Sequence, residues 1–440
     1  MQTILRFTRF SLVAAAVSLG AACLNAAPLE EGFTSLFNGQ DLTGWRSPSG
    51  KSGGYGVTNG VMFCGKGVGG KLMTEKEFSD FILRIEFKLD EGANNGVGIR
   101  APLEGDAAYN GMEIQILDDV AADKGKWGKL KETQYHGSIY DVFAAKRGAL
   151  KPPGEWNEEE ITAIGRHVKV VVNGKTIIDA NLNEAPVGKL MGHPGLLRER
   201  GHIGWLGHGD YLEFRNVRIK EVPAAEKENT APEGFTALFN GQDLTNWKGL
   251  LKGPNDNPIK RAALSDEDRA KAQEEADANM KAHWKAEGGE IVFDGKGRSL
   301  CTLKDFGDFE MYVDWKLPAH GDSGVYLRGS PQVQIWDPHT QPTHAGSEVG
   351  SGGFYNNQKN PSKPLKVADK PIGEWNRFRI VMVGEKAHIF LNGEQVVNAT
   401  TLENYWDRKQ PIFPTGQIEL QNHGGPLWFK NIYIRELPAK

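Results

Sequence analysis

Hydrophobic and polar residues alternate with a period of two in several short segments of the chain. Residues 81–89, FILRIEFKL, put five large apolar side chains on one face and Arg84, Glu86 and Lys88 on the other. Residues 309–317, FEMYVDWKL, repeat this pattern in the same phase. Alternation with one polar face is typical of a half-buried antiparallel strand. We therefore predict a strand over each segment.

Two further segments have the pattern of a β-hairpin. Residues 168–178, VKVVVNGKTII, place an Asn-Gly pair between two runs of β-branched residues, and residues 388–397, HIFLNGEQVV, do the same. Both positions of such a tight turn need a positive φ, which Asn and Gly tolerate. Each turn Asn follows the Asn of a Trp-Asn pair by 16 residues, Asn157 to Asn173 and Asn376 to Asn392.

These patterns recur because the chain contains an internal repeat. Residues 32–45, GFTSLFNGQDLTGW, and residues 234–247, GFTALFNGQDLTNW, agree at twelve of fourteen positions without a gap. Each copy also ends with an alternating segment, residues 212–219 and 427–434. A match of this length indicates a tandem duplication. We predict a first domain over residues 28–222, a linker over 223–233 and a second domain over 234–440.

Many short strands, frequent turns and little helix predict an all-β fold, with one β-sandwich for each copy. The second copy carries an insertion. The offset between the copies is 202 at Trp45 and Trp247 but 228 at Phe81 and Phe309, so the second copy has 26 more residues there. Ser265 precedes an acidic stretch and can cap a helix. We predict a helical insertion around residues 255–284, on the surface of the second sandwich.

The N-terminus has the pattern of a secretion signal. Arg6 and Arg9 are followed by a short apolar run and then by small residues up to Ala26, so we predict a signal peptide over residues 1–26. Cys23 offers the alternative of a lipid-anchored N-terminus. No later apolar run reaches the ~20 residues of a membrane span. We therefore expect an exported protein, periplasmic or extracellular, that is a lipoprotein if Cys23 carries a lipid.

Composition narrows the possible partners. Removing residues 1–26 takes two arginines from the 52 basic residues and none from the 56 acidic ones, so the net charge falls from −4 to −6. A negative balance does not favour binding to nucleic acid. The remaining cysteines, Cys64 and Cys301, lie in different copies at positions that do not correspond. A disulfide framework is therefore not expected.

Several motifs occur in both copies, and together they resemble one known family. They are the LFNGQDLT opening, NNGVGIR (94–100) with DSGVYLR (322–328), MEIQILDD (112–119) with VQIWD (333–337), GEWN (154–157 and 373–376), and GHIGWLGHG (201–209) with GQIELQNHG (416–424). The chain resembles the 3-keto-disaccharide hydrolase domain family, in two tandem copies. The resemblance implies concanavalin A-like jelly-roll sandwiches with a sugar site in the concave sheet. It also implies exported enzymes that act on glycosides already oxidised at C3.

That chemistry sets requirements for a site. A ketone at C3 acidifies the hydrogen on C2, so a base can form an enolate, the C1 substituent leaves by elimination, and water then adds. The site needs a base, a donor for the enolate oxygen and an acid for the leaving group. An ordinary glycosidase instead needs two carboxylates at a fixed separation.

The first copy offers candidates for each role. Glu113 and Gln115 project to the same side of a predicted strand, with two isoleucines on the other side, as expected for a polar groove above a packed core. Asp118 ends that strand, and Arg100 is a candidate to bind a hydroxyl or the enolate oxygen. The candidate bases and acids are Glu113, Asp118 and two histidines that titrate near neutrality. We expect Glu113, His208 and Asp118 to be catalytic, and Arg100, Gln115, His136 and Tyr140 to bind substrate.

The second copy departs from the first at two of these positions. Gln332 stands at the position of Glu113, and Ser351 stands at that of His136. The other counterparts are retained: Gln334, Asp337, Tyr355, Arg328 and His423 correspond to Gln115, Asp118, Tyr140, Arg100 and His208. If Glu113 is the base, the second copy is a binding module, because Gln cannot take the proton. If His423 or Asp337 serves as the base, both copies can be active, with Arg328, Gln332, Gln334, Trp336 and Tyr355 binding substrate.

Each candidate also has a structural alternative. Glu113 and Gln115 can be the solvated face of a strand, and Arg100 can be an ion-pair partner of Asp118. His208 can be a turn residue that bonds to backbone, and His136 fits a structural role better than a catalytic one.

Aromatic residues and one loop complete the candidates. Trp45, Trp205, Trp247 and Trp336 can stack on sugar rings, although the bulk of Trp45 and Trp247 fits a core anchor better and Trp336 is the best placed to face ligand. Asp337, His339 and His344 cluster in WDPHTQPTH, but their spacing matches no defined ligand set and two prolines indicate a solvated loop. We predict no cofactor and no metal ligands at the site, and leave open whether a divalent metal is needed.

The sequence thus favours an enzyme that cleaves 3-keto-glycosides or 3-keto-disaccharides. Two other functions remain open. One is a lectin-like protein that binds carbohydrate without catalysis, because one fold can host both. The other is a conventional glycoside hydrolase with two carboxylates.

Overall fold

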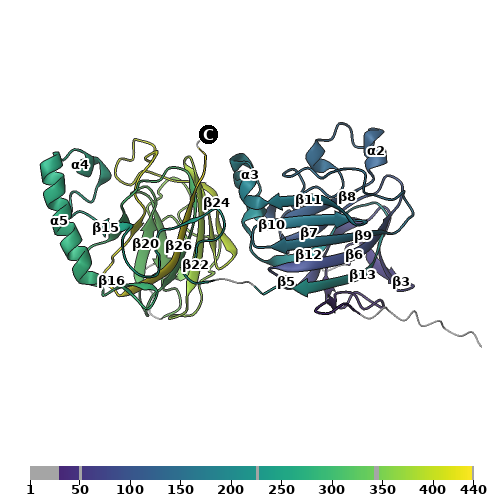
Figure 1. Ribbon diagram of the computed structural model, residues 1–440, viewed down its shortest axis with the longest axis horizontal. Coiled ribbons are helices and arrows are strands. Elements are labelled where there is room, and N and C mark those ends of the chain that lie inside the picture. Colours follow the sequence, from purple (N-terminus) through teal and green to yellow (C-terminus); the bar gives the residue numbers. More distant parts are fainter. Residues whose placement is uncertain (1–28, 49–51, 224–226, 341–345, 439–440) are drawn as a thin grey trace, which may run out of the picture.

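The computed structural model describes residues 29–48, 52–223, 227–340 and 346–438. The predicted signal peptide, Cys23 and His344 lie outside these residues. The chain forms two β-sandwiches side by side, as Figure 1 shows, so the predicted all-β, tandem-sandwich fold is confirmed. Within the described residues, every helix is too short or too polar to cross a membrane.

Each sandwich pairs an eight-stranded antiparallel sheet with a five-stranded one. In the first domain the larger sheet contains β11 (Lys175–Asn181), β10 (His167–Val172), β9 (Asn157–Ile164), β6 (Phe81–Leu89), β13 (Leu212–Glu221), β4 (Val61–Cys64), β3 (Tyr55–Thr58) and β1 (Thr34–Ser35). The smaller sheet contains β2 (Trp45–Arg46), β5 (Gly69–Phe78), β12 (Gly201–His208), β7 (Asn94–Ala101) and β8 (Met112–Leu117). The short helices are α1 (Ala107–Asn110), α2 (Asp119–Asp123), η1 (Glu132–Gln134), η2 (Leu182–Glu184), α3 (Val187–Gly192) and η3 (Pro194–Leu197).

The second domain repeats this arrangement strand for strand. Its larger sheet contains β16 (Trp284–Glu287), β17 (Glu290–Phe293), β26 (Leu427–Glu436), β19 (Phe309–Lys316), β22 (Asn376–Val383), β23 (Lys386–Leu391), β24 (Glu394–Thr401) and β14 (Thr236–Ala237). Its smaller sheet contains β15 (Trp247–Gly249), β18 (Leu300–Thr302), β25 (Glu419–Leu420), β20 (Asp322–Tyr326) and β21 (Gln332–Trp336). A 3-10 turn, η4 (Ser347–Val349), follows β21.

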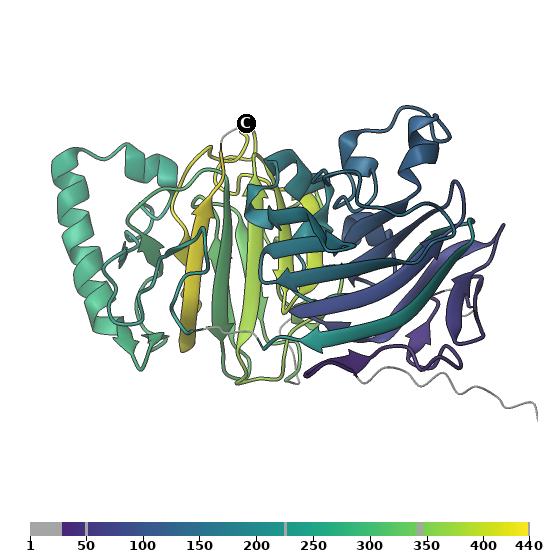
Figure 2. The ribbon, with the colours of Figure 1, turned by 45° about the vertical axis from the view of Figure 1, so that its right-hand side comes forward.

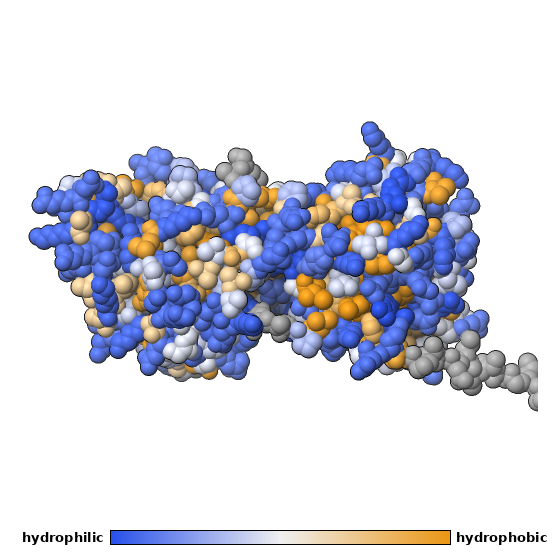
Figure 3. All heavy atoms as spheres, in the orientation of Figure 1, coloured by the Kyte–Doolittle hydropathy of each residue, from blue (hydrophilic) through white to orange (hydrophobic). Residues whose placement is uncertain are grey.

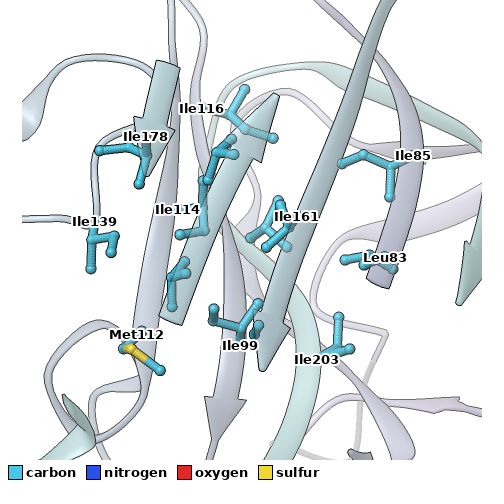
Figure 4. Close-up of a cluster of buried hydrophobic side chains, with 14 of the residues drawn as sticks. Leu83, Ile85, Ile99, Met112, Ile114, Ile116, Ile139, Ile161, Ile178 and Ile203 are labelled. Carbon is cyan, nitrogen blue, oxygen red and sulfur yellow. The ribbon is translucent and has the colours of Figure 1, made fainter. Parts of the chain in front are cut away.

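The core of each domain lies between its two sheets. In the first domain, Leu83 and Ile85 of β6 belong to the same buried cluster as Ile114 and Ile116 of β8 and Ile161 of β9, as the close-up in Figure 4 shows. β6 alternates buried and half-buried residues along its whole length, as its sequence predicts. The two cysteines, Cys64 and Cys301, are buried and free, so the expectation of no disulfide holds for them.

The recurring Trp-Asn pair fixes each hairpin. Asn173 Nδ2 donates to Asn157 Oδ1 at 2.8 Å, and Asn392 Nδ2 donates to Asn376 Oδ1 at 2.8 Å. Asn173 and Asn392 both have a positive φ, as the predicted turns require. The 16-residue spacing is therefore the distance along the chain between two hydrogen-bonded side chains.

The insertion of the second domain forms α4 (Pro258–Ala262) and α5 (Asp266–His283). Ser265 Oγ accepts a hydrogen bond from Asp268 N at 3.1 Å, so the predicted cap is confirmed. Only Ala276 and Met280 of α5 are buried. Figure 3 accordingly shows a hydrophilic surface over this helix, at the left edge of the molecule.

The two domains are joined through one face of the second. α3 and η3 of the first domain pack on the outer face of the larger sheet of the second, as the turned view in Figure 2 shows. Val381, Val383 and Phe390 of that sheet join the same hydrophobic cluster as Leu190 and Leu197. The prediction that residues 309–317 form a half-buried strand is therefore wrong for the second copy, because β19 is buried on both faces up to its last residue.

A buried charge cluster lies in this interface. Glu310 of β19 is bonded by the guanidinium groups of Arg379 and Arg435, and Arg379 also donates to the carbonyl of Leu197 in the first domain. Burial alone would raise the pKa of Glu310, but Arg379, Arg166 and Arg435 together lower it to about 2. The carboxylate is therefore charged at neutral pH and balances guanidinium groups from both domains.

One buried carboxyl in the first domain has the opposite environment. Both carboxyl oxygens of Glu159, on β9, are buried without a hydrogen-bond partner among the described residues, and burial raises its pKa to about 8. The second domain has Phe378 at this position. Because the unfolded pKa is near 4.5 and the folded one near 8, Glu159 lowers stability increasingly between these pH values.

We expect Glu159→Gln to stabilise the protein at pH 7 by on the order of 3 kcal/mol, and to change stability little at pH 4, where the carboxyl is protonated in both states. Urea unfolding of variant and wild type at both pH values measures the difference. Glu158→Gln, at an exposed position on the same strand, is the control. An equal effect of Glu159→Gln at the two pH values would contradict this assignment.

Candidate functional site

The smaller sheet of the first domain carries a group of polar side chains on its outer face. Glu113 and Gln115 project from β8 to this face, while Ile114 and Ile116 enter the core, as the alternation predicts. His208, at the end of β12, lies on the same face, with its Nε2 4.0 Å from Glu113 Oε1. The structure thus brings together three of the predicted site residues.

Glu113 is a buried carboxyl, and one of its two oxygens has no hydrogen-bond partner among the described residues. That oxygen is Oε1, and the side chain is 4% exposed. Burial raises the pKa of Glu113, and the nearby His208 lowers it in part. In return, the nearby Glu113 carboxylate raises the pKa of His208. A raised carboxyl pKa beside an imidazole is the arrangement that general acid–base chemistry near neutral pH requires.

Gln115 adds a second unpaired acceptor next to Glu113. Its Nε2 donates to Asn94 Oδ1 at 3.1 Å, while its Oε1 is buried without a partner in the described part of the chain. Leaving a buried acceptor unpaired costs about 1–3 kcal/mol. Two such oxygens, side by side on one strand, are best explained as acceptors for the hydroxyl groups of a ligand.

Gly96 gives Glu113 its position. A Cβ on Gly96 would lie 2.0 Å from Glu113 Oε1, so the carboxyl lies flat across the place where a side chain would be. Beside it, Met73, Ala101, Ala107 and Leu206 form a small apolar cluster. The candidate site therefore has polar side chains, Glu113 and Gln115, next to an apolar cluster on the same sheet.

We expect Gly96→Ala to displace the carboxyl of Glu113 and to lower activity on the order of 100-fold, because misplacement of a catalytic group by about 1 Å has that effect. Gly98→Ala is the matched control, because its Cβ would lie 3.4 Å from Leu206 in ordinary contact. Neither glycine has a positive φ, so both variants should fold. Steady-state kinetics and thermal unfolding of the two variants test this, and equal activities would contradict it.

Aromatic side chains and a histidine lie next to β8, the edge strand of the smaller sheet. Tyr140 N donates to the carbonyl of Glu113 at 2.9 Å, and its hydroxyl accepts from Gln134 Nε2 at 2.9 Å. Tyr109 contacts the Tyr140 ring edge-on and stacks on His193 at 4.3 Å. The sequence reasoning missed Asn94, Tyr109 and His193, and only Asn94 lies in a motif that occurs in both copies.

The second domain presents a different face. Gln332 Nε2 donates to Gln334 Oε1 and to Gln421 Oε1, both at 2.8 Å, and Gln334 Nε2 donates to Asp322 Oδ1 at 2.8 Å. His423 Nδ1 lies 3.3 Å from Asp322 Oδ2. The structure therefore groups Gln332, Gln334 and His423 as predicted, but the amides hold one another.

Arg100 and Arg328 do not face either groove, so that prediction is wrong. Arg100 is 1% exposed, pairs with Asp80 at 2.9 Å and donates to the carbonyls of Ser79 and Gly165. Arg328 pairs with Asp308 at 2.7 Å in the same way. The alternative partner, Asp118, is also wrong. Both arginines tie the turns of the larger sheet to the end of the smaller one.

His136 and Trp205 lie in the core of the first domain and not at the groove. His136 is fully buried against Phe87, and burial lowers its pKa to about 3. Trp205 is stacked between Trp45 and Phe214, with ring centroids 5.5 and 4.0 Å away. The expected core position of Trp45 and Trp247 is confirmed.

Asp118 and Asp337 are held by backbone groups. Asp118 accepts from the N–H groups of Gly92, Val120 and Ala121, and Asp337 accepts from those of His320, His339 and Thr340. Asp118 therefore caps α2 and Asp337 holds a loop, and these bonds oppose a role for either as a free base. Among the described residues, no three potential metal ligands come together.

Trp336 and Tyr355 lie together at the groove of the second domain. Their rings meet edge-on at 5.6 Å, and Tyr355 is 61% exposed. Ser351 is buried and accepts from Trp336 N at 2.9 Å, so it replaces the buried His136 without facing the groove.

Comparison with known proteins agrees with this architecture. The model of the 3-keto-α-glucoside-1,2-lyase-like domain matches residues 32–220 and again residues 234–435. A 3-keto-disaccharide hydrolase of Bacteroides thetaiotaomicron is 26% identical over 251 residues, which are 46% of this chain and 84% of the relative. Two solved structures of presumed glycosyl hydrolases from Parabacteroides distasonis are also similar. One is 30% identical and the match covers 43% of this chain and 99% of that structure, with a TM-score of 0.38. The other is 27% identical and the match covers 44% of this chain and 95% of that structure, also with a TM-score of 0.38.

The family match covers both sandwiches, and together with the Bacteroides relative it indicates a carbohydrate-active protein of the hydrolase type. The chain belongs to the family of 3-keto-α-glucoside-1,2-lyase-like domains and carries two of them in tandem.

Proposed function

We propose that the first domain cleaves 3-keto-glycosides by proton abstraction at C2, elimination and hydration. The observation that carries this proposal is the buried carboxyl of Glu113, with an unpaired oxygen 4.0 Å from His208 Nε2. The name of the Bacteroides relative, a 3-keto-disaccharide hydrolase, supports the substrate class.

Glu113 is the base in this mechanism. It takes the C2 proton, and the electrons of the C2–H bond form the enolate of the 3-ketone. The C1–O bond then breaks as a C1=C2 double bond forms, and the imidazolium of His208 gives its proton to the leaving oxygen. Water adds at C1, His208 takes a proton from it, and Glu113, whose proton has meanwhile exchanged with solvent, donates a proton to C2. The raised pKa values of Glu113 and His208 suit these roles.

The enolate oxygen needs a donor other than Arg100, which is buried elsewhere. We assign this role to the hydroxyl of Tyr140, because Tyr140 neighbours Glu113 across the sheet edge and already accepts from Gln134. A hydroxyl that accepts one hydrogen bond keeps its own proton for a ligand. Gln115 and Asn94 then hold the sugar hydroxyls.

A conventional two-carboxylate mechanism is less well supported. It requires a second carboxylate about 5–10 Å from the first, facing the same ligand. Asp118, the predicted candidate on the strand of Glu113, is held by three backbone N–H groups at the far end of that strand.

The test is to incubate the protein with an aryl 3-keto-glucoside and with its unoxidised parent in D₂O. We expect the aryl group to be released from the keto compound alone, with deuterium at C2 of the released sugar. Release from both compounds, without deuterium, would indicate a conventional glycosidase. Release from neither, with binding retained, would indicate a lectin-like protein.

Export is a further part of the proposal, since residues 1–26 have the pattern of a signal peptide. The mass of the protein purified from its native host tests it. Loss of about 26 residues is expected after cleavage, whereas a lipid on Cys23 would add mass to the shortened chain.

A further inference from the structure

The same row of positions crosses the smaller sheet in both domains, and its chemistry differs between them. In the first domain the register aligns Gly204, Gly98 and Glu113, with Tyr140 next in line. In the second domain it aligns Glu419, Tyr326 and Gln332, followed by Tyr355. Neighbouring strands are about 4.8 Å apart, so each row spans roughly 15 Å, enough for a disaccharide.

The base of the first domain has no equivalent in the second. Gln332 takes the place of Glu113 and is held by Gln334 and Gln421. A carboxamide accepts no proton at neutral pH. Glu419 does not restore the pairing of a carboxyl with a histidine, because His423 lies beyond the end of β25 (Glu419–Leu420) and pairs with Asp322 at 3.3 Å.

Glu419 is nevertheless a buried acceptor without a hydrogen-bond partner among the described residues. Its side chain is 6% exposed, and the accepting atom is Oε1. Arg261 Nη2, from α4 of the insertion, lies 3.8 Å away. The counterpart in the first domain is Gly204, so this carboxyl and the guanidinium beside it are specific to the second domain.

The other end of the row is aromatic. Tyr355 is 61% exposed next to Gln332, and Trp336 supports it from the same strand as the glutamines. Trp336 Nε1 is also buried without a partner in the described part of the chain. An exposed aromatic ring beside amides, with a carboxylate at the opposite end of the row, is a combination that can pack on the C–H face of a sugar and bond to its hydroxyls.

We propose that the outer face of the smaller sheet of the second domain binds a neutral, unoxidised glucoside without cleaving it, through Glu419, Gln332 and the Tyr355–Trp336 pair. This inference rests on the proposed function in one respect only, the choice of a glucoside as the ligand. Because the domains share a buried interface, this site holds carbohydrate at a fixed position relative to the reacting site in the first domain.

The test is isothermal titration of the full chain with α,α-trehalose, in the Glu113→Gln background. We expect one binding event, weakened about three- to tenfold by Tyr355→Ala, and more by Glu419→Ala, which removes the acceptor at the opposite end of the row. Tyr140→Ala, the matched change in the first domain, should leave this binding unchanged.

Three outcomes would overturn the proposal. They are no trehalose binding by the parent, binding that Tyr355→Ala and Glu419→Ala leave intact, and loss of binding in Tyr140→Ala alone. Circular dichroism checks that each variant is folded. Release of the aryl group from a 3-keto-glucoside is measured separately with the intact Glu113, so failure of the proposed function is distinguishable from failure of this inference.

Discussion

Replacing Glu113 with Gln is expected to lower kcat/KM for a 3-keto-glucoside by about 10²–10⁴, the usual contribution of a positioned base. The change keeps the size and shape of the side chain and removes only its ability to take a proton. The second domain already accommodates Gln332 at this position, across the equivalent glycine, Gly324. The fold should therefore be unaffected.

The pH profile gives this prediction a second readout. Because the pKa of Glu113 is raised by burial, activity should rise with pH through a value above the ordinary 4.5 of a glutamate. Because the pKa of His208 is raised by Glu113, activity should fall again above 6.5. In Glu113→Gln the residual activity should no longer rise with pH at the acidic side of the profile. The fall at the basic side should move to lower pH, because His208 loses the carboxylate that raises its pKa.

Glu160→Gln is the matched control, since Glu160 lies on the outer face of the other sheet, paired with Arg84. It should leave both kcat/KM and the pH profile unchanged. Full activity in Glu113→Gln would mean that the base lies elsewhere, and the second domain would then have to be tested as the active one.

Local patterns in the sequence were enough to predict most of the fold. Alternation identified β6 and β8, and the Asn-Gly pairs identified the hairpins, because both depend on neighbours a few residues apart. The constant spacing from Asn157 to Asn173 reported a real side-chain contact. The alternation of Glu113 and Gln115 also identified the face of the candidate site.

Residues whose partners come from distant loops could not be assigned in this way. Arg100 follows a motif on a strand of the groove, but its guanidinium turns back to Asp80 and Gly165, which come together only in the folded sheet. His136 was a reasonable base by type, yet its loop returns over the core beside Phe87. Glu419 was visible only by comparing the copies, as Glu opposite Gly204.

One difference between the two copies of the sequence reflects the interface between the domains. β9 reads NEEEITAI, whereas its counterpart β22 reads NRFRIVMV, which is apolar on both faces in its second half. A strand with two buried faces implies a second packing partner. The sequence did not identify that partner, because α3 and η3 meet this sheet through long-range packing.

The charge cluster at this interface carries the largest expected effect on stability. Glu310→Gln keeps the shape of the side chain but leaves Arg435 and Arg166 without this buried counter-charge, and leaves Arg379 only the more distant Glu199, 3.9 Å away. Removing one member of a buried ion pair costs about 3–5 kcal/mol. We expect a loss of this size in urea unfolding, together with faster proteolysis in the linker, as the two domains separate before they unfold.

An exposed ion pair in the first domain tests whether burial causes the large effect of Glu310→Gln on stability. Arg84 and Glu160 occupy the counterpart strands but are about one-third exposed, so Glu160→Gln should cost at most about 1 kcal/mol. The pKa of Glu310 is lowered to about 2, so its contribution is complete above 4.5 and is lost as the pH falls towards 2. Wild type and Glu310→Gln should therefore converge in stability at low pH. A small effect of Glu310→Gln at neutral pH would mean that apolar packing of α3 alone holds the domains together.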